Sequence, residues 1–431
     1  MKVITTYEYS HISYHDIFPN QSNEKSSYES LKKLNNLISE KYSHLLRTDL
    51  EGIYIKNFVG IIKIDEATIE ILPKIFKHEN DNMDGSTKTE IYKNLYYMIN
   101  KALKVPTNNI DYNQFNVSRG DVLDFLINLF LDGLSLKLFK GLYRTYVREE
   151  ENSNYIKGKI LVSKNIVRNP INTKIYNEYD NYTDDNLVNQ IFKFVVKEML
   201  NTTQWQQNRI IAKNILQTLS NVSDISVSET SFNKVKYDRL LGEYEKLLNF
   251  AKFYFFSQSV NFRGNGENNV FVFNIDMNTV YQDYISELLK EYAPEIFNNN
   301  STVQTQKRSK HLIFDEYNNG CFNLQPDISI ENKKVIELII DTKYKRLNLG
   351  KPRKGVSDKD LYQMFGYYHK YNKPKIVLLY PKYIQEVADI YHFYEDEPSK
   401  LQVCTVNLNN KLYTQEGEWE IIKDLKRTLL N

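Results

Sequence analysis

Two carboxylates and a lysine lie at the ends of two short β-prone segments in the last third of the chain. Asp327 begins the first segment, and Asp341 and Lys343 follow the apolar residues 335–340 of the second. The polar residues 331–334 between them predict a hairpin, which would bring Asp327 close to Asp341 in a register that the sequence leaves open. Side chains two residues apart on a strand share a face, so Asp341 and Lys343 are expected to lie together.

Such a cluster is a poor structural element but a good Mg²⁺ site. Mg²⁺ prefers hard oxygen ligands, and it typically takes one or two carboxylates while keeping waters and a substrate phosphate. The metal would activate a water and stabilise charge on a phosphodiester. The competing interpretation is a solvated basic face, because Lys345 and Arg346 follow Lys343 closely and a lone D-x-K often arises by chance.

A helix is predicted after this hairpin. Ser357 is the expected N-cap, and Asp360 stands at the third helical position, as in a capping box. Gln363 and Tyr367 are four residues apart and therefore share one helix face. An apolar strand is predicted at residues 375–380, so the order is strand, strand, helix, strand, as expected for a nuclease core with a right-handed crossover.

This order of P-D, D-x-K and then Q-x-x-x-Y on the next helix resembles the PD-(D/E)xK nuclease superfamily in its RecB-like form. The resemblance implies that Asp327 and Asp341 are metal ligands. It implies that Lys343 orients the attacking water and neutralises developing charge. Gln363 and Tyr367 would support the site or contact DNA.

The charge pattern adds a local basic segment to this site. The net charge is only +2, so there is no overall attraction to nucleic acid. Basic residues instead gather beside the predicted site, on a strand end and a loop that could bind phosphates. These basic residues are Lys343, Lys345, Arg346, Lys351, Arg353 and Lys354. A solvated loop explains the charge equally well.

Several other classes of protein are disfavoured. The two cysteines, Cys321 and Cys404, lack metal-ligand spacing, so a disulfide framework is not expected and a reducing cytoplasm fits. The seven histidines show no paired metal spacing, and neither a G-x-x-x-x-G-K-[ST] phosphate loop nor a G-x-S-x-G motif occurs. The first residues do not read as a signal peptide, and no apolar run is long enough to span a membrane.

The length of 431 residues allows two or three domains. Residues 1–110 are expected to form a β-rich domain, with strands at 52–55, 59–64 and 68–72 and helices at 30–42 and 90–103. Residues 111–265 are expected to form a mostly helical middle region, with helices at 122–139, 186–200, 206–219 and 240–256 and a strand at 158–162. Residues 266–431 are expected to hold the α/β nuclease core, beginning near Phe271. Loops are predicted at 77–88 and 259–270, and the fold class is α+β, multidomain.

Segments outside the nuclease core resemble the McrC family, and the resemblance covers nearly the whole chain. It rests on the motifs around Asp327, Asp341 and Gln363 and on residues 58–64, 69–75, 141–146, 156–160, 179–189 and 276–278. It implies the nuclease subunit of a McrBC modification-dependent restriction system. The C-terminal domain of such a subunit would cut double-stranded DNA in a Mg²⁺-dependent way.

The same resemblance implies a partner, McrB, which is a hexameric AAA+ GTPase that recognises DNA containing methylated cytosine and translocates. The N-terminal domain would dock into the motor ring and stimulate GTP hydrolysis. GTP would be bound by the partner and no nucleotide by this chain, which agrees with the missing phosphate loop. The protein would act in the cytoplasm of a bacterium, and the frequent Lys, Asn, Ile and Tyr are typical of an AT-rich genome.

One position departs from the family pattern. Family members commonly carry an acidic residue just after an aromatic in the helix that follows D-M-N, and here Gln282 occupies that place. Asp283 is the next residue, turned by about 100° around a helix, and Glu287 lies one turn further on. The site could use two carboxylates, which we favour, or Asp283 could substitute imperfectly, or Glu287 could contribute.

Two other functions are compatible with the sequence. The first is an adaptor that stimulates the motor without cutting DNA, which Gln282 in place of an acid favours. The second is a free-standing RecB-like exonuclease that binds DNA ends through the residues before the nuclease core. The endonuclease subunit is the leading hypothesis.

Overall fold

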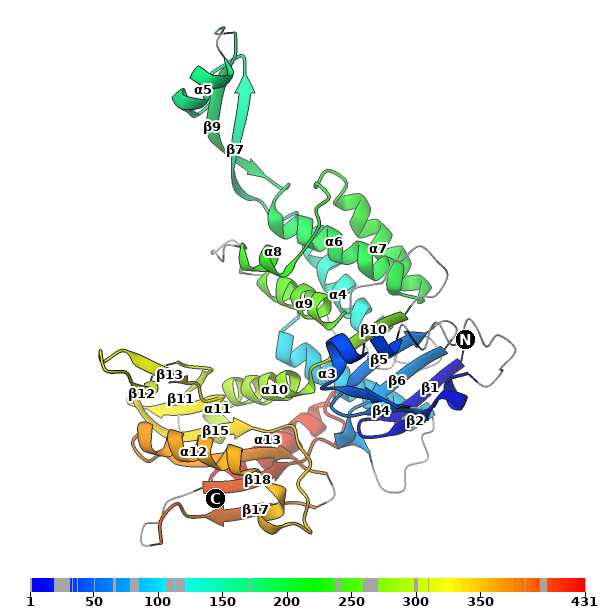
Figure 1. The fold of residues 1–431 in the computed structure, drawn as a ribbon, viewed down its shortest axis with the longest axis vertical. Coiled ribbons are helices and arrows are strands. Elements are labelled where there is room, and N and C mark those ends of the chain that lie inside the picture. The colour runs from blue at the N-terminus through cyan, green and yellow to red at the C-terminus, as the bar shows by residue number, and fades with distance from the viewer. Residues whose placement is uncertain are drawn as a thin grey trace. The chain divides into compact units, whose positions relative to one another are not determined.

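The computed structural model divides the chain into two compact units (Figure 1). Unit 1 comprises residues 1–104, 111–122 and 257–431, and unit 2 comprises residues 105–110 and 123–256. The residues whose structure is described are 2–18, 32, 34–36, 38–49, 51–64, 67–77, 85–105, 112, 121–169, 171, 173–235, 237, 241–242, 244–258, 270–297, 301–308, 310–383, 385–395 and 401–430. Helices and several sheets are both present, which confirms a mixed α and β fold. The domain ranges 1–110, 111–265 and 266–431 stay predictions.

The first sheet of unit 1 joins the start of the chain to a strand from its second half. Its strand order is β1-β6-β5-β10. The strands are β1 (Lys2–Tyr7), β6 (Ala67–Leu72), β5 (Val59–Ile64) and β10 (Val270–Ile275). β10 runs antiparallel to β5, with Phe273 opposite Ile61. Phe271, the expected start of the nuclease core, therefore lies in this first sheet, because the apolar residues of β10 are buried against β5.

Gly60 permits this pairing. Its φ is 139°, a backbone conformation that few residues with a side chain adopt. A Cβ at this position would lie 2.0 Å from the carbonyl oxygen of Phe273. The close approach of β5 and β10 therefore requires glycine.

A second, smaller sheet packs on the first around a shared apolar core. Its order is β2-β4-β3, from β2 (His11–Ser13), β4 (Gly52–Ile55) and β3 (Leu46–Thr48). The predicted strands at 52–55, 59–64 and 68–72 are confirmed. Short helical turns complete this part: α1 (Tyr14–Ile17), the π-helix η2 (Ile38–Tyr42) and η3 (Lys74–Phe76). Of the predicted helix 30–42, residues 32 and 34–36 are helical and 38–42 form η2, while 30, 31, 33 and 37 lie outside the described residues.

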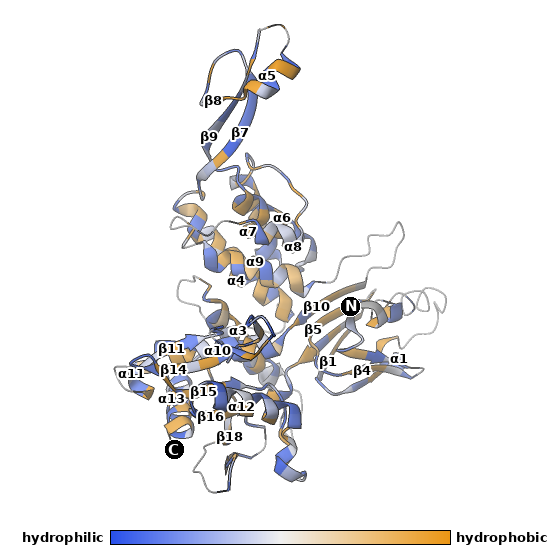
Figure 2. Cartoon of the chain, turned by 60° about the vertical axis from the view of Figure 1, so that its left-hand side comes forward, coloured by the Kyte–Doolittle hydropathy of each residue, from blue (hydrophilic) through white to orange (hydrophobic). Residues whose placement is uncertain are grey.

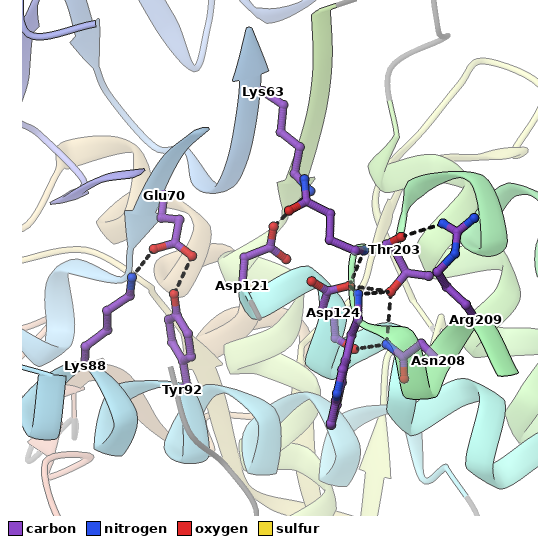
Figure 3. Close-up of polar contacts among 11 residues, drawn as sticks. Lys63, Glu70, Lys88, Tyr92, Asp121, Asp124, Thr203, Asn208 and Arg209 are labelled. Atoms are coloured by element: carbon purple, nitrogen blue, oxygen red, sulfur yellow. Dashed lines mark hydrogen bonds and ion pairs between the residues drawn. The ribbon is translucent and has the colours of Figure 1, made fainter. Parts of the chain in front are cut away.

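Helix α3 (Gly85–Leu103) is tied to the first sheet through Glu70 (Figure 3). The Tyr92 hydroxyl donates to Glu70 Oε1 at 2.6 Å, and Lys88 forms an ion pair with the same carboxylate. On β5, Lys63 forms an ion pair with Asp121 at 2.9 Å (Figure 3). The predicted helix 90–103 is confirmed. The loop predicted at 77–88 is wrong for residues 85–88, which are helical, and residues 78–84 lie outside the described residues.

A six-stranded sheet forms the later part of unit 1, in the order β11-β14-β15-β16-β18-β17. Its strands are β11 (Ser301–Thr305), β14 (Ile328–Asn332), β15 (Val335–Thr342), β16 (Lys375–Pro381), β18 (Leu401–Val406) and β17 (Ala388–Tyr391). β14 and β15 are antiparallel, as predicted, and β15, β16 and β18 are parallel. Helix α12 (Asp358–Lys370) connects β15 to β16, so the predicted order of strand, strand, helix, strand is confirmed.

The hairpin between β14 and β15 turns at Lys333 and Lys334, which have φ values of 49° and 68°. Two consecutive positive φ values are typical of the tight type I′ turn that joins antiparallel strands. Ile328 lies opposite Ile340 in the observed register. Continuing that register by one residue places Asp327 across from Asp341, which settles what the sequence left open.

Helices and a second hairpin surround this sheet. They are α10 (Met277–Glu291), α11 (Ala293–Ile296), α13 (Gln415–Leu430), the short η5 (Pro352–Gly355) and the two-stranded sheet of β12 (Lys310–Phe314) and β13 (Gly320–Leu324). One face of α12 packs on the sheet through Met364, Tyr367 and Tyr368 in an apolar cluster with Ile339 and Leu378. None of the helices in the described ranges is long and apolar enough to cross a membrane.

Unit 2 contains a group of helices. They are α4 (Val122–Phe139), α6 (Leu187–Thr202), α7 (Gln206–Thr218), α8 (Glu229–Asn233) and α9 (Glu245–Ser257). Buried Asp124 joins α4 to the α6–α7 loop by accepting hydrogen bonds from Thr203 Oγ1 and from the Gln204 amide (Figure 3). The predicted helices are confirmed, except that the last begins at Glu245 and residue 240 lies outside the described residues.

A long hairpin in unit 2 carries a small helix at its far end (Figure 1). It consists of β7 (Thr145–Ser153), β8 (Lys159–Ile160), α5 (Val162–Arg168) and β9 (Ile175–Thr183). The predicted strand 158–162 is therefore too long, because the chain turns into α5 at Val162. The loop predicted at 259–270 lies outside the described residues except for Val270, which belongs to β10.

Candidate active site

The β14–β15 hairpin fixes the first carboxylate. Asp327 precedes β14, and its Oδ2 accepts hydrogen bonds from the backbone N and the Oγ1 of Thr342, both at 2.9 Å. Thr342 is the middle residue of the D-x-K motif at the end of β15. Asp327 is therefore held across the strand end that carries Asp341 and Lys343.

The second carboxylate is buried and paired with the lysine. Asp341 is only 1% exposed, and its Oδ2 lies 2.6 Å from Lys343 Nζ. Within the described ranges, Asp341 Oδ1 has no hydrogen-bond partner. A buried carboxylate oxygen without a donor is costly unless a cation or water satisfies it. The predicted grouping of Asp327, Asp341 and Lys343 is thus observed in the structure.

Helix α12 brings two further predicted residues to this group. Lys343 Nζ donates to Gln363 Oε1 at 3.2 Å, and Gln363 Nε2 donates to the Tyr367 hydroxyl at 3.0 Å. Tyr367 in turn donates to the backbone carbonyl of Gln325 at 2.9 Å, two residues before Asp327. Gln363 and Tyr367 therefore connect the lysine to the segment that carries the first carboxylate.

Asp360, which the sequence predicts as a helix-cap residue and not as a candidate site residue, also lies at the candidate site. Its amide donates to Ser357 Oγ, as predicted, but its carboxylate lies 3.7 Å from Lys343 and 2.9 Å from Lys345. Asp360, Gln363 and Tyr367 are spaced by three and four residues and so share one helix face. That spacing was a signal that could have identified Asp360.

Two other predicted basic residues pair outside this cluster, with Arg353 at 2.8 Å from Asp358 and Lys354 at 2.7 Å from Asp389. Lys345 pairs with Asp360, but the Arg346 guanidinium donates to the backbone carbonyl of Lys74 and stacks 3.6 Å from the Tyr383 ring centre. Arg346 therefore contacts the N-terminal part of unit 1.

The electrostatics of the group reflect two close, buried carboxylates. Burial, followed by the neighbouring Asp327 carboxylate, raises the pKa of Asp341 to about 7 against the opposing effect of Lys343. Burial also raises the pKa of Asp327, although hydrogen bonds from Thr342 oppose it. Burial alone would lower the pKa of Lys343, but the carboxylates of Asp341, Asp360 and Asp327 together outweigh burial, so the pKa is raised. The cluster of Asp327, Asp341 and Lys343 can therefore hold an extra positive charge.

The two possible helical acids on α10, Asp283 and Glu287, have different neighbours. Burial first, then Glu287, and also Asp327 raise the pKa of Asp283 to about 6, so Asp283 lies within electrostatic reach of the site. Glu287 instead forms ion pairs with Lys104 and Lys290. The Nε2 atom of Gln282 is buried, with no hydrogen-bond partner in the described part of the chain.

The donor set fits a hard cation. Among the described residues, no group of three or more histidine, cysteine or acidic side chains is close enough to form a complete metal cage. Mg²⁺ does not need one, since it usually takes one or two carboxylates and keeps several waters. Asp327 and Asp341, with the unsatisfied Oδ1 of Asp341, match that requirement. A metal ion held there would act as a Lewis acid and lower the pKa of a bound water.

Comparison with known proteins identifies the family. The model of the family described as McrBC 5-methylcytosine restriction system component matches residues 53–381, so the chain belongs to this family. No curated protein matches it. A chain in the refined half-complex from the tetradecameric assembly of Thermococcus gammatolerans McrB AAA+ hexamers with bound McrC shares the fold, with a TM-score of 0.62 and 21% identity over all of both chains. A chain of the T. gammatolerans McrBC complex is 24% identical over 67% of this chain and 87% of its own length, with a TM-score of 0.48.

Proposed function

We propose that this protein is the Mg²⁺-dependent DNA endonuclease subunit of a McrBC-type restriction system, with a PD-(D/E)xK core in the six-stranded sheet. Methylcytosine-containing duplex DNA is the expected substrate. The observation that carries the proposal is the buried Asp341, which faces Asp327 and lies 2.6 Å from Lys343 with one oxygen unsatisfied. Membership of the McrBC family supports the system to which the chain is assigned.

Each residue of the group has a role in this proposal. Asp327 and Asp341 would hold Mg²⁺, which when bound supplies Lewis acidity and a water of lowered pKa. Lys343, kept protonated by the acids around it, orients the attacking water and offsets charge on the phosphate. Gln363 holds the lysine in place by its hydrogen bond to Nζ. Asp283 is the better candidate for an additional acid, because Glu287 is already paired with two lysines.

A McrB-like AAA+ GTPase hexamer is the proposed partner, and it would bind the GTP. The T. gammatolerans assembly, which shares this fold, contains McrB AAA+ hexamers with bound McrC. The N-terminal β-rich part is the docking element predicted from the sequence. The far end of the β7–β9 hairpin is a second candidate, because several aliphatic side chains are exposed there. They are Ile156, Val162, Ile166, Val167 and Ile171.

Removing Asp341 tests the nuclease. In the complex with the GTPase, Asp341→Ala is expected to reduce DNA cleavage by about two orders of magnitude or more, since metal-site substitutions act on the chemistry directly. Stimulation of GTP hydrolysis should be retained. Both rates would be measured in one reconstituted mixture, with Glu287→Gln as the control that keeps cleavage. A smaller loss with Asp283→Asn would support its contribution.

Three results would lead to other conclusions. Wild-type cleavage by Asp341→Ala would show that the site is misassigned. Stimulation of the GTPase by the wild-type chain without cleavage, in Mg²⁺ or Mn²⁺, would favour the non-cleaving adaptor. Rapid degradation of linear DNA by the isolated chain would favour the free-standing exonuclease.

A further inference from the structure

A two-stranded ribbon of β12 and β13 exposes apolar side chains beside the candidate site. In the described part of the chain, neither strand pairs with any other strand. An isolated hairpin is marginally stable in water and normally packs its apolar residues against something. This ribbon leaves five large apolar side chains exposed, namely Leu312, Ile313, Phe314, Tyr317 and Phe322.

Phe322 has the most unusual conformation in the ribbon. Its φ is 55°, in the left-handed region that bulky residues rarely adopt. Its side chain is 73% exposed, so burial of the ring does not compensate for the strained backbone. Strained residues of this kind gather at functional sites. The conformation therefore points to a ligand contact made by this ring.

The base of the ribbon is joined to the candidate site by hydrogen bonds. Arg308 Nε donates to Gln325 Oε1 at 2.8 Å, and the Gln325 carbonyl accepts the bond from Tyr367 that leads through Gln363 to Lys343. On the other strand, Lys310 Nζ donates to the last carbonyl of α12 at 2.6 Å. A ligand seated on the ribbon would thus lie in a fixed relation to the lysine and the carboxylates.

The distribution of charge favours a polyanion as that ligand. Lys307, Arg308 and Lys310 lie at the base of the ribbon, where Lys307 pairs with Glu331 at 2.6 Å while Arg308 and Lys310 donate to uncharged oxygens and keep their positive charge. The two acids, Asp315 and Glu316, are confined to the turn. Asp315 is occupied there, because it accepts hydrogen bonds from the amides of Tyr317 and Asn319.

We propose that the β12–β13 ribbon enters a groove of the duplex next to the scissile phosphate. This inference rests on the proposed function and deepens it. A groove of B-DNA admits a two-stranded β-ribbon, and apolar side chains such as Phe and Ile contact base edges or wedge between base steps. Phe322 and Ile313 contact the bases, and the cations at the ribbon's base contact phosphates.

DNA binding by catalytically inactive protein tests the ribbon. Ile313→Ser and Phe322→Ser would be made in the Asp341→Asn chain, and affinity for a labelled duplex would be measured by fluorescence anisotropy. Each substitution is expected to raise the Kd about tenfold. Phe322→Tyr keeps the ring and should preserve affinity. Ile390→Ser on β17 is the matched control, since Ile390 is as exposed as Ile313.

The outcomes separate this inference from the proposed function. If Ile313→Ser and Phe322→Ser bind DNA as the parent does, or if the parent binds no duplex, the ribbon does not contact DNA. Weaker self-association at unchanged DNA affinity would likewise overturn it and assign the ribbon to a second copy of the chain. The binding assay uses the Asp341→Asn chain and does not depend on cleavage. If the Asp341→Asn chain cleaves DNA at the wild-type rate, that result overturns only the nuclease assignment.

Discussion

At the scale of single residues, Asp341 experiences the strongest electrostatic conflict in the site. Its carboxylate is buried, lies across from a second acid, and is compensated by one lysine. The same conflict that raises its pKa to about 7 makes the position attractive to a divalent cation, because metal and proton compete for the same oxygens.

The pH dependence of stability follows from this shift. A folded-state pKa of about 7 lies above the ordinary value near 3.9 for aspartate, so the folded protein binds the proton more tightly than the unfolded chain. The stability that Asp341 contributes is therefore fully present below about pH 4 and is lost as pH rises through about 7. In metal-free buffer, we expect Asp341→Asn to raise Tm relative to wild type more at pH 8 than at pH 5. An equal difference in Tm between the variant and the wild type at both pH values, measured by calorimetry, would contradict the raised pKa of Asp341.

At the scale of elements, a buried ion pair links the first sheet to the segment after β15. Lys74 is fully buried, and its Nζ lies 3.1 Å from Glu8 Oε1 and 3.9 Å from the Tyr344 ring centre. Tyr344 directly follows Lys343 and donates its hydroxyl to Glu8 at 2.8 Å. The N-terminal strands therefore help to position the strand end that carries the D-x-K motif.

Breaking this pair is expected to be costly. Removing one partner of a buried ion pair leaves an uncompensated charge, so Lys74→Met should lower the free energy of unfolding by about 3–5 kcal/mol. Lys164→Met, which breaks the exposed pair with Glu150, should change it by less than about 1 kcal/mol. Denaturant titration measures both. Glu8→Gln combined with Lys74→Met should recover part of the loss. If Lys74→Met is as stable as Lys164→Met, the buried ion pair is unimportant for stability.

At the scale of the whole molecule, the structure alters how the docking surface should be tested. Deleting the N-terminal part would leave β10 without β5 and Tyr344 without Glu8, so a truncated chain would lose support for the candidate site itself. Surface substitutions avoid this problem. The exposed aliphatic residues near α5 in unit 2 are suited to such substitutions, and Figure 2 shows apolar residues on that helix.

Substitutions on α5 should identify the surface that activates the motor. We expect Ile166→Ser with Val167→Ser to reduce stimulation of the partner's GTPase about tenfold, because exposed apolar patches commonly mark protein interfaces. Cleavage in the complex should fall with it, while the unfolding temperature stays unchanged. Ile210→Ser on α7 is the control, as Ile210 is also exposed in unit 2. If the double variant stimulates the partner's GTPase normally, the N-terminal strands remain the proposed docking element.

The sequence by itself determined those features that depend on local spacing. Asp341 and Lys343 share a strand face, Gln363 and Tyr367 share a helix face, and Ser357 caps α12, because each relation is set by residues a few positions apart. Only the tertiary structure decided which distant segments meet. It placed β10 beside β5, turned Arg346 toward Lys74, and brought Asp360 to the candidate site. Such choices depend on long-range pairing and burial, which local periodicity does not encode.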